Sequence, residues 1–290
     1  MDLVALLGLA VRASIFLIVF SLGLGATHED ALYLFRRPGQ LVRSLLAMNV
    51  VMPLVAAGLA AAFDLGVPVE AVLIALAVSP VPPILPRKEL KAGGRASYAV
   101  GLLVAAALLA IVFVPLAVEV LGWAFAREAR MPASAVARLV AITVLLPIAA
   151  GIIVKRVAPA LAGRIVGPIS VGATVLLGAA ALLIMFSAWP AAMALIGNGR
   201  VLAIAGFIVI GLVAGHLLGG PDPEDRIVLA LSTASRHPGI ALAIATTNFP
   251  GEKRVIGAVL LYLLVSAIVS IPYLTWRRRR LAGAAGAAGT

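Results

Sequence analysis

Long apolar runs alternate with short polar connections along the whole chain. Each run of about 20 residues is long enough to cross about 30 Å of hydrocarbon as a helix. Nine runs occur, and no long hydrophilic stretch separates them, which predicts an all-α polytopic membrane protein of about nine transmembrane helices. The predicted spans lie near residues 5–26, 41–63, 69–90, 96–123, 136–156, 166–188, 201–219, 227–249 and 255–276.

The third and eighth runs are interrupted by helix-breaking residues. The third carries four prolines between residues 80 and 86, and the eighth carries Pro238-Gly239. Proline removes a backbone donor and clashes with the preceding turn, so a continuous helix is not expected at either place. At membrane depth, broken backbone is tolerated only where protein buries it or where it lines a wet cavity. The pattern therefore predicts two broken helices beside an internal site.

The composition also indicates that the chain is surrounded by lipid rather than by water, and it excludes cysteine chemistry. The chain is 63% hydrophobic and 12% charged, with a mean hydropathy of +1.14, whereas a soluble domain carries roughly 25% charged residues. The absence of cysteine excludes disulfides and thiolate sites. The net charge of +11 is attributed to loops that face anionic lipid headgroups rather than to nucleic-acid binding.

The distribution of basic residues predicts the orientation. Thirteen lie in one set of loops and six in the other, which places the first set in the cytoplasm, the N-terminus outside and the C-terminus inside a bacterial inner membrane. The first set comprises Arg36, Arg37, Arg43, Lys91, Arg95, Lys155, Arg156, Arg164, Arg226 and Arg277 to Arg280. The second set comprises Arg127, Arg130, Arg138, Arg200, Lys253 and Arg254.

The two broken spans occupy matched positions in the two halves of the chain. Each is followed by one further helix, and the orientation makes them run in opposite directions, as an inverted repeat requires. We predict one transmembrane domain over residues 1–280, with a first repeat at about 1–126 and a second at about 134–280. The small, polar residues 281–290 are expected to form a disordered tail.

Charged residues beside the breaks indicate an anion site. Arg236 lies inside a span, where a charge is costly and usually functional or paired. Helix-end N–H groups together with a guanidinium suit a carboxylate, sulfonate or phosphate. Arg87 has the alternative of snorkelling to lipid headgroups, and His237 that of coupling protons or of remaining a neutral hydrogen-bonding group. The predicted substrate-binding residues are Arg236, His237, Pro238, Gly239, Pro82, Pro83, Pro86 and Arg87.

Hydroxyl and amide side chains flank the second break and could coordinate a sodium ion. Ser and Thr in a membrane helix also commonly bond to their own backbone, and that alternative stays open. The predicted ion-binding residues are Ser232, Thr233, Ser235, Thr246 and Asn248.

These segments resemble the bile acid:sodium symporter family, in its bacterial branch, from about Ser14 to Trp276. The resemblance is carried by FLIVFSLGLGATHEDALYLFRRPGQLVRS, SPVPPILPRKELKAGGRASYAVGL, LLPIAAGIIVKRV and STASRHPGIALAIATTNF. It implies a core domain and a panel domain, two helices that cross at unwound centres, and alternating access to organic anions. Many bacterial members have ten helices, and by this resemblance the first of these is expected to be missing here.

The resemblance also draws attention to departures at the crossing. Ser232 stands where the family usually has Glu, and Arg236 and His237 stand where Gln and Asn are usual. Fixed cations oppose sodium binding, so sodium coupling, proton coupling and uncoupled transport all remain open.

These features favour a secondary active transporter of a small organic anion, with no cofactor besides a possible Na⁺. An intramembrane enzyme is disfavoured because the chain has no HExxH, aspartate-rich metal or GxSxG motif. A channel or a sensor is a further alternative, and the oligomeric state is left open.

Overall fold

In the computed structural model, the described residues are 3–124, 129–252 and 254–287, and the regular structure among them is entirely helical. The elements, where η marks a π-helix, are α1 (Leu3–Gly25), α2 (His28–Ala31), α3 (Pro38–Leu45), η1 (Leu46–Val51), α4 (Met52–Ala62), α5 (Gly66–Val78), α6 (Leu85–Lys91), α7 (Ala96–Ala124), α8 (Ala133–Val140), η2 (Ala141–Leu145), α9 (Leu146–Val157), α10 (Pro159–Met193), α11 (Arg200–Leu218), α12 (Pro223–Ala234), α13 (Pro238–Asn248) and α14 (Val255–Ala287).

The predicted spans and both predicted breaks are confirmed. Within the described ranges, eight helical segments are long and apolar enough to cross a membrane, and α5 is a shorter apolar helix. The third run is divided into α5 and α6 by the proline-rich segment 79–84, and the eighth into α12 and α13 by residues 235–237. The protein is therefore a multi-pass α-helical membrane protein.

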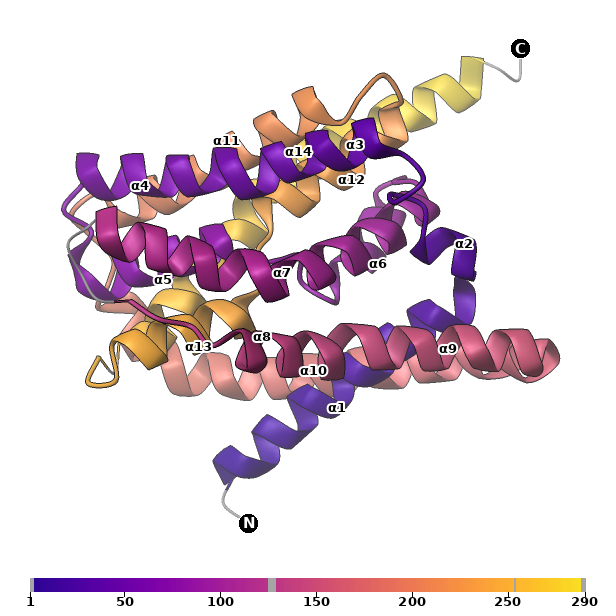
Figure 1. Ribbon diagram of the computed structural model, residues 1–290, viewed down its shortest axis with the longest axis horizontal. Coiled ribbons are helices and arrows are strands. Elements are labelled where there is room, and N and C mark those ends of the chain that lie inside the picture. Colours follow the sequence, from indigo (N-terminus) through magenta and orange to yellow (C-terminus); the bar gives the residue numbers. More distant parts are fainter. Residues whose placement is uncertain (1–2, 125–128, 253, 288–290) are drawn as a thin grey trace.

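The helices form two layers (Figure 1). One layer contains α1, α10 and the segment α8–η2–α9, and the other contains the remaining long helices. Only 28% of the most apolar window of α1 and 11% of that of α10 is buried, against 61% for α7 and 72% for the α12–α13 segment. Helices α1 and α10 therefore present apolar surface to lipid, while the broken helix lies in the interior of its layer. We call these the peripheral layer and the central layer.

Within the peripheral layer, α1 and α9 approach closely through two glycines. A Cβ atom on Gly23 would lie 2.4 Å from the backbone oxygen of Ile148, and one on Gly151 would lie 2.3 Å from that of Phe20. Membrane helices commonly use small residues in this way, because no hydrophobic driving force pulls them together and close backbone packing must replace it.

Two helices contain a π-helical turn immediately before a proline. η1 precedes Met52-Pro53, and η2 precedes Leu146-Pro147. A π-turn shifts backbone pairing from i→i+4 to i→i+5 and so adjusts the ladder around a residue without an N–H group.

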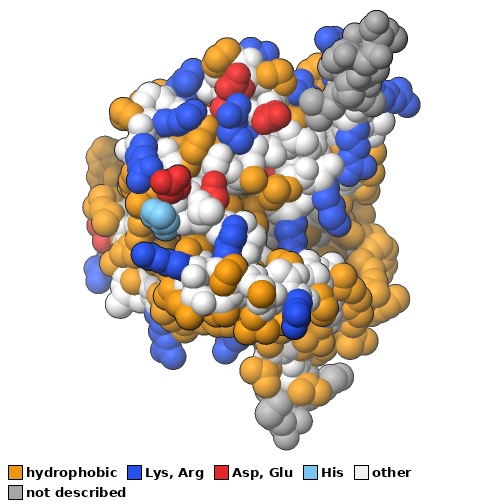
Figure 2. Space-filling view, turned by 90° about the vertical axis from the view of Figure 1, so that its right-hand side faces the viewer, with side chains coloured by type: hydrophobic (Ala, Val, Ile, Leu, Met, Phe, Trp, Pro, Cys, Tyr) orange, Lys and Arg blue, Asp and Glu red, His pale blue; other side chains and the backbone are white. Residues whose placement is uncertain are grey.

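The basic residues of the larger predicted set gather at one end of the molecule, which we call the basic end (Figure 2). The ends of α1, α6 and α14 and the starts of α3, α7 and α12 lie there (Figure 1). Of the smaller predicted set, Arg127 and Lys253 lie outside the described residues.

The chain end differs from its prediction. Helix α14 continues to Ala287, so residues 281–287 are helical where a disordered tail is expected, and residues 288–290 lie outside the described part. Alanine has the highest helix propensity, and it lets the apolar helix continue past the membrane despite the glycines. The predicted repeat boundary near residue 126 also falls outside the described residues.

Candidate functional site

The two broken helices meet at their interruptions. The backbone N–H of His237, which precedes α13, donates to the carbonyl oxygen of Pro80, which follows α5, at 2.9 Å. Pro238 is the first residue of α13, where its missing N–H group costs nothing. The His237 side chain caps that helix, because its Nδ1 accepts from the N–H groups of Gly239 and Ile240 at 3.2 and 3.3 Å. The predicted crossing is thus a direct contact between the two breaks.

Arg236 lies at this crossing with only 1% of its surface exposed. Its Nε donates to the Leu76 carbonyl at 3.1 Å, and its Nη2 donates to the carbonyls of Ala77 and Met48 at 2.6 and 3.1 Å. Its Nη1 has no partner among the described residues. In this conformation the guanidinium is held by backbone carbonyls, and Arg236 lines neither of the two described cavities.

Two prolines explain why two of those carbonyls lack a backbone donor. In the i→i+5 pattern of η1, the Met48 carbonyl would pair with the N–H of residue 53, which is a proline. Ala77 belongs to the last turn of α5, where carbonyls lack helical partners, and residue 80 is again a proline, whereas the Leu76 carbonyl also accepts from the N–H of Ser79 at 3.0 Å. A cation at a helix C-terminus is also favoured by the helix dipole. Arg236 therefore satisfies the acceptors that the breaks leave behind.

Tyr262 of α14 satisfies the other side of the second break. Its hydroxyl accepts from the N–H of Arg236 at 2.9 Å and donates to the carbonyl of Ala234 at 3.0 Å. Both groups are freed where α12 ends, so a single buried hydroxyl repairs the interruption. The residues before the break are therefore fixed on one side by α14 and on the other by α5.

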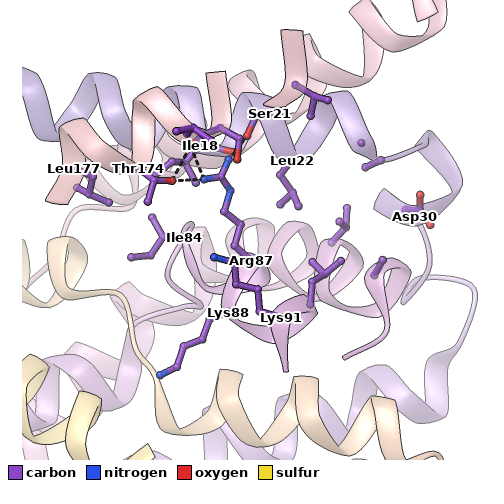
Figure 3. A pocket seen from close by; sticks show the side chains of 18 of the residues that line it. Ile18, Ser21, Leu22, Asp30, Ile84, Arg87, Lys88, Lys91, Thr174 and Leu177 are labelled. Carbon is purple, nitrogen blue, oxygen red and sulfur yellow. Dashed lines mark hydrogen bonds between the residues drawn. The ribbon is translucent and has the colours of Figure 1, made fainter. Parts of the chain in front are cut away.

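A cavity of about 810 Å³ lies beside the first break, between the two layers. Helices α1 and α10 line one wall, and α6 with the start of α7 lines the other; Ile84 and Arg87 lie in its wall (Figure 3). Its lining runs from Leu177 within α10 to Gly25, at the end of α1. The cavity therefore extends from the interior toward the basic end, and we call it the basic cavity.

Arg87 links the two walls of the basic cavity. Its Nη1 donates to the Thr174 hydroxyl at 2.7 Å and to the Ser170 carbonyl at 3.2 Å, both on α10, and its Nη2 donates to the Ser21 hydroxyl on α1 (Figure 3). Of the predicted substrate-binding residues, Arg87 alone lines this cavity, and its contact with substrate remains a prediction. Pro82 and Pro83 are buried in the α5–α6 connection, and Pro86 opens α6.

The charge of the basic cavity is strongly unbalanced. Four cationic side chains line it, from Arg87, Lys88, Lys91 and Arg278, against one carboxylate, from Asp30. Most of the remaining lining is aliphatic. Such a lining suits a molecule with an anionic group and an apolar body, because fixed cations hold the charge while the apolar walls bury the rest.

The opposite face of α6 carries a residue that the sequence pattern alone does not single out. Glu89 is fully buried, and its Oε1 accepts from the Ser232 hydroxyl of α12 at 2.6 Å. Its neighbours in sequence, Lys88 and Leu90, line the basic cavity. The available signal for Glu89 is its place as a carboxylate in a broken apolar run between basic residues.

The predicted ion-binding residues have separate partners. Ser232 bonds to Glu89, while Thr233 and Thr246 donate to carbonyls of their own helices at 2.7 and 2.8 Å. Asn248 donates to the carbonyls of Ile244 and Arg130 and lines a second cavity, of about 310 Å³, between α5, α7 and α13. The Ser235 side chain is partly buried. A shared sodium shell for these residues remains a prediction.

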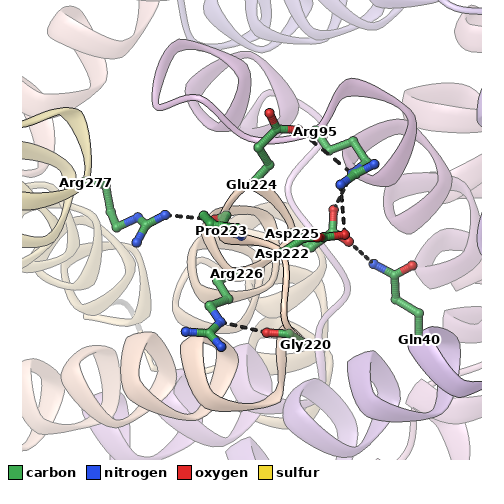
Figure 4. Close-up of polar contacts among 9 residues, drawn as sticks. All are labelled: Gln40, Arg95, Gly220, Asp222, Pro223, Glu224, Asp225, Arg226 and Arg277. Carbon is green, nitrogen blue, oxygen red and sulfur yellow. Dashed lines mark hydrogen bonds and ion pairs between the residues drawn. The ribbon is translucent and has the colours of Figure 1, made fainter. Parts of the chain in front are cut away.

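An ion cluster joins three elements at the basic end (Figure 4). Arg95 contacts Asp225 at 2.6 Å and Asp222 at 3.0 Å, and Gln40 of α3 donates to Asp225 at 3.0 Å. Burial alone lowers the pKa of Arg95, but its hydrogen bond to Asp225 and the nearby acidic charges outweigh burial, so the pKa of Arg95 is raised. The cluster ties the start of α12 to α3 and α7.

Comparison with known proteins relates this chain to a family of membrane transporters. The model of the Sodium Bile acid symporter family matches residues 13–194, more than half of the chain. A Bacillus subtilis (strain 168) protein described as an uncharacterized sodium-dependent transporter, YocS, is 28% identical over 246 residues, which cover 80% of this chain and 72% of that protein. The match to the family model includes α1 from residue 13, the broken α5–α6 segment and all of α10, which line most of the basic cavity. The chain therefore belongs to the Sodium Bile acid symporter family.

Proposed function

We propose that the protein is a secondary active transporter that moves an amphipathic organic anion across a bacterial inner membrane by alternating access. The observation that carries this proposal is the basic cavity, which combines four cations with aliphatic walls next to the crossing of two broken helices. Paired broken helices surround the substrate site in several transporter folds, so a cavity at this place is a natural substrate site.

The dimensions of the cavity fit a molecule of moderate size. Ligand sites of about 300–1,000 Å³ bury most of a small organic molecule, and 810 Å³ lies within that range. Arg87 holds its guanidinium between α1 and α10 and offers donors to an anionic group there. Lys88 and Lys91 follow on the same helix, so the cation density increases toward the basic end.

The two layers supply the moving parts. The cavity lies between the peripheral and central layers, so a rocking motion of one layer against the other would close it at the basic end and open it at the opposite end. With the predicted orientation, which puts the N-terminus outside and the C-terminus in the cytoplasm, this conformation is the inward-facing one. Breaking the contacts of Arg87 with Ser21 and Thr174 is one step of that motion.

Arg236 has a different role from Arg87 in this mechanism. Its three carbonyl bonds hold the crossing together, so its predicted contact with substrate requires another conformation in which they are released. Sodium remains a candidate coupling ion, because the Bacillus subtilis relative is described as sodium-dependent. A proton is the other candidate coupling ion.

Thermal stabilisation by anions tests the proposed function while the substrate is still unidentified. Purified protein in detergent would be melted with taurocholate, hexanesulfonate, benzoate or succinate, each as its sodium salt at equal ionic strength. A ligand that binds only the folded state raises the melting temperature in a saturable way. We expect at least one amphipathic anion to do so, and we expect the combined Arg87→Gln and Lys88→Gln variant to lose the effect.

The control is Lys155→Gln, which removes a cation that does not itself line the cavity, although it donates to the carbonyl of the lining residue Gly25. It should keep the anion effect of the natural protein. Absence of any saturable stabilisation across the four anions would contradict the proposed function, as would an equal effect in the cavity variant.

A further inference from the structure

Glu89 is a fully buried carboxyl group with one unused oxygen. Its Oε1 accepts from Ser232, whereas its Oε2 has no hydrogen-bond partner among the described residues. The described ion pairs leave Glu89 out. Taking a carboxylate from water without a matched cation is strongly unfavourable, and binding a proton removes that penalty.

The groups that face Glu89 come from three helices. Helix α12 contributes Ser232, which is not ionised, and α7 contributes Tyr98, whose hydroxyl is bonded to Ser44 at 2.8 Å. Its own helix contributes Lys88, the cation whose charge acts on it. Arg95, at the start of α7, is engaged by the acidic cluster. Lys88 is therefore the cation whose electrostatic interaction with Glu89 changes when Glu89 gains or loses a proton.

Lys88 connects the two faces of α6. It lines the basic cavity with Arg87 and Lys91, while Glu89 faces the interior of the central layer. When Glu89 is ionised, its negative charge attracts Lys88 and competes with an anion in the cavity. When Glu89 is protonated, the charge of Lys88 is available to the anion. Proton binding and anion binding therefore favour each other through one side chain.

We propose that Glu89 is the proton-binding site that couples anion transport to protons, a proposal that rests on the function proposed above. One proton binds to the carboxylate, without any other bond change, together with the anion, and both leave on the other side of the membrane. A monovalent anion and its proton together carry no net charge. The loaded carrier therefore has the same net charge as the empty one when it changes between its two states. The ligand of this site is a proton, and Ser232 positions the carboxyl group.

Infrared difference spectroscopy tests the protonation without any substrate. The carbonyl stretch of a protonated carboxylic acid is separate from that of a carboxylate, and the natural protein should lose one such band as the pH rises. Glu89→Gln keeps the size and a polar side chain for Ser232 and should lack the band. Glu29→Gln removes a solvent-exposed carboxyl at the basic end and should keep it. A spectrum of Glu89→Gln that matches the natural protein would overturn the proposal.

Calorimetry tests the coupling, with taurocholate as the probe. Titration in two buffers of different ionisation enthalpy gives the number of protons taken up on binding. At a pH at which the infrared band of the free protein has been lost, we expect uptake of close to one proton by the natural protein, and in that range an affinity that falls about tenfold per pH unit. Glu89→Gln should bind taurocholate with no proton uptake and with little dependence on pH.

The outcomes separate the two proposals. Binding of taurocholate by the natural protein without proton uptake, at a pH at which the infrared band has been lost, would overturn the role of Glu89 and leave the anion carrier intact. Failure of taurocholate and of the other three anions to bind would contradict the proposed function itself. Persistent proton uptake in Glu89→Gln would assign the coupling to another group and would also overturn the proposal.

Discussion

Replacing Arg236 distinguishes a residue that holds the crossing from one that holds the substrate. Arg236→Met keeps much of the side-chain length and removes all donors. The carbonyls of Ala77 and Met48 then lose the donor that Arg236 supplies inside the central layer, while the carbonyl of Leu76 keeps the N–H of Ser79. Because water cannot reach them easily, the change should lower the free energy of unfolding.

The size of the effect follows from two opposing terms. A buried acceptor left without a donor costs about 1–3 kcal/mol, so the two acceptors of Ala77 and Met48 amount to about 2–6 kcal/mol. Removing a buried cation releases several kcal/mol of desolvation cost in the opposite direction. We therefore expect Arg236→Met to lower the free energy of unfolding by about 1–3 kcal/mol. Arg236→Lys, which keeps the charge but not the planar fork, should lower it by about half as much.

The assay is reversible unfolding in mixed micelles of a mild detergent and sodium dodecyl sulfate, combined with anion binding measured by thermal stabilisation. Arg87→Met is the matched control, because Arg87 is only half-buried and lines the basic cavity. It should lose anion binding with a small change in stability. The opposite pattern in Arg236→Met, with stability changed by less than about 1 kcal/mol and anion binding lost, would refute the structural role of Arg236.

Two further predictions concern packing and the ion cluster. Gly151→Ala places a methyl group against the Phe20 carbonyl and should lower the free energy of unfolding by about 1–3 kcal/mol. The control Gly178→Ala meets open space and should be neutral or stabilising. Equal effects of the two changes in the same unfolding assay would contradict the packing of α1 on α9. Asp225→Asn removes a carboxylate that is 7% exposed and paired with Arg95. It should lower the melting temperature clearly more than Asp222→Asn, whose carboxylate is 52% exposed. The reverse order would argue against a role of the cluster in holding α3, α7 and α12 together.

The long elements and both interruptions were predictable because they depend on local signals. Apolar length identifies the spans, and the prolines at 80–86 and at 238 determine where helices stop, whatever the tertiary structure. The disordered tail was a poorer prediction, because alanine continues α14 to residue 287 without needing tertiary contacts.

The partners of the polar groups could not be predicted in the same way. Arg236 attracts attention in the sequence as an isolated charge, but its carbonyl partners come from η1 and α5, more than 150 residues away. Glu89 and Ser232 meet across 143 positions, and no local pattern connects them. The sequence identifies which residues are costly to bury, while the fold decides what satisfies them.

The most direct test of the central claim is substrate protection of an engineered thiol in the basic cavity. The natural sequence has no cysteine, so Leu177→Cys introduces a single thiol into the cavity lining, and Leu183→Cys introduces one on the apolar surface of α10. A membrane-impermeant maleimide would be added to inverted and to right-side-out vesicles. We predict labelling of Leu177→Cys in inverted vesicles, slowed by a saturating amphipathic anion, and little labelling of Leu183→Cys. Labelling that no anion slows, or that occurs equally from both sides, would contradict a cytoplasm-facing anion cavity.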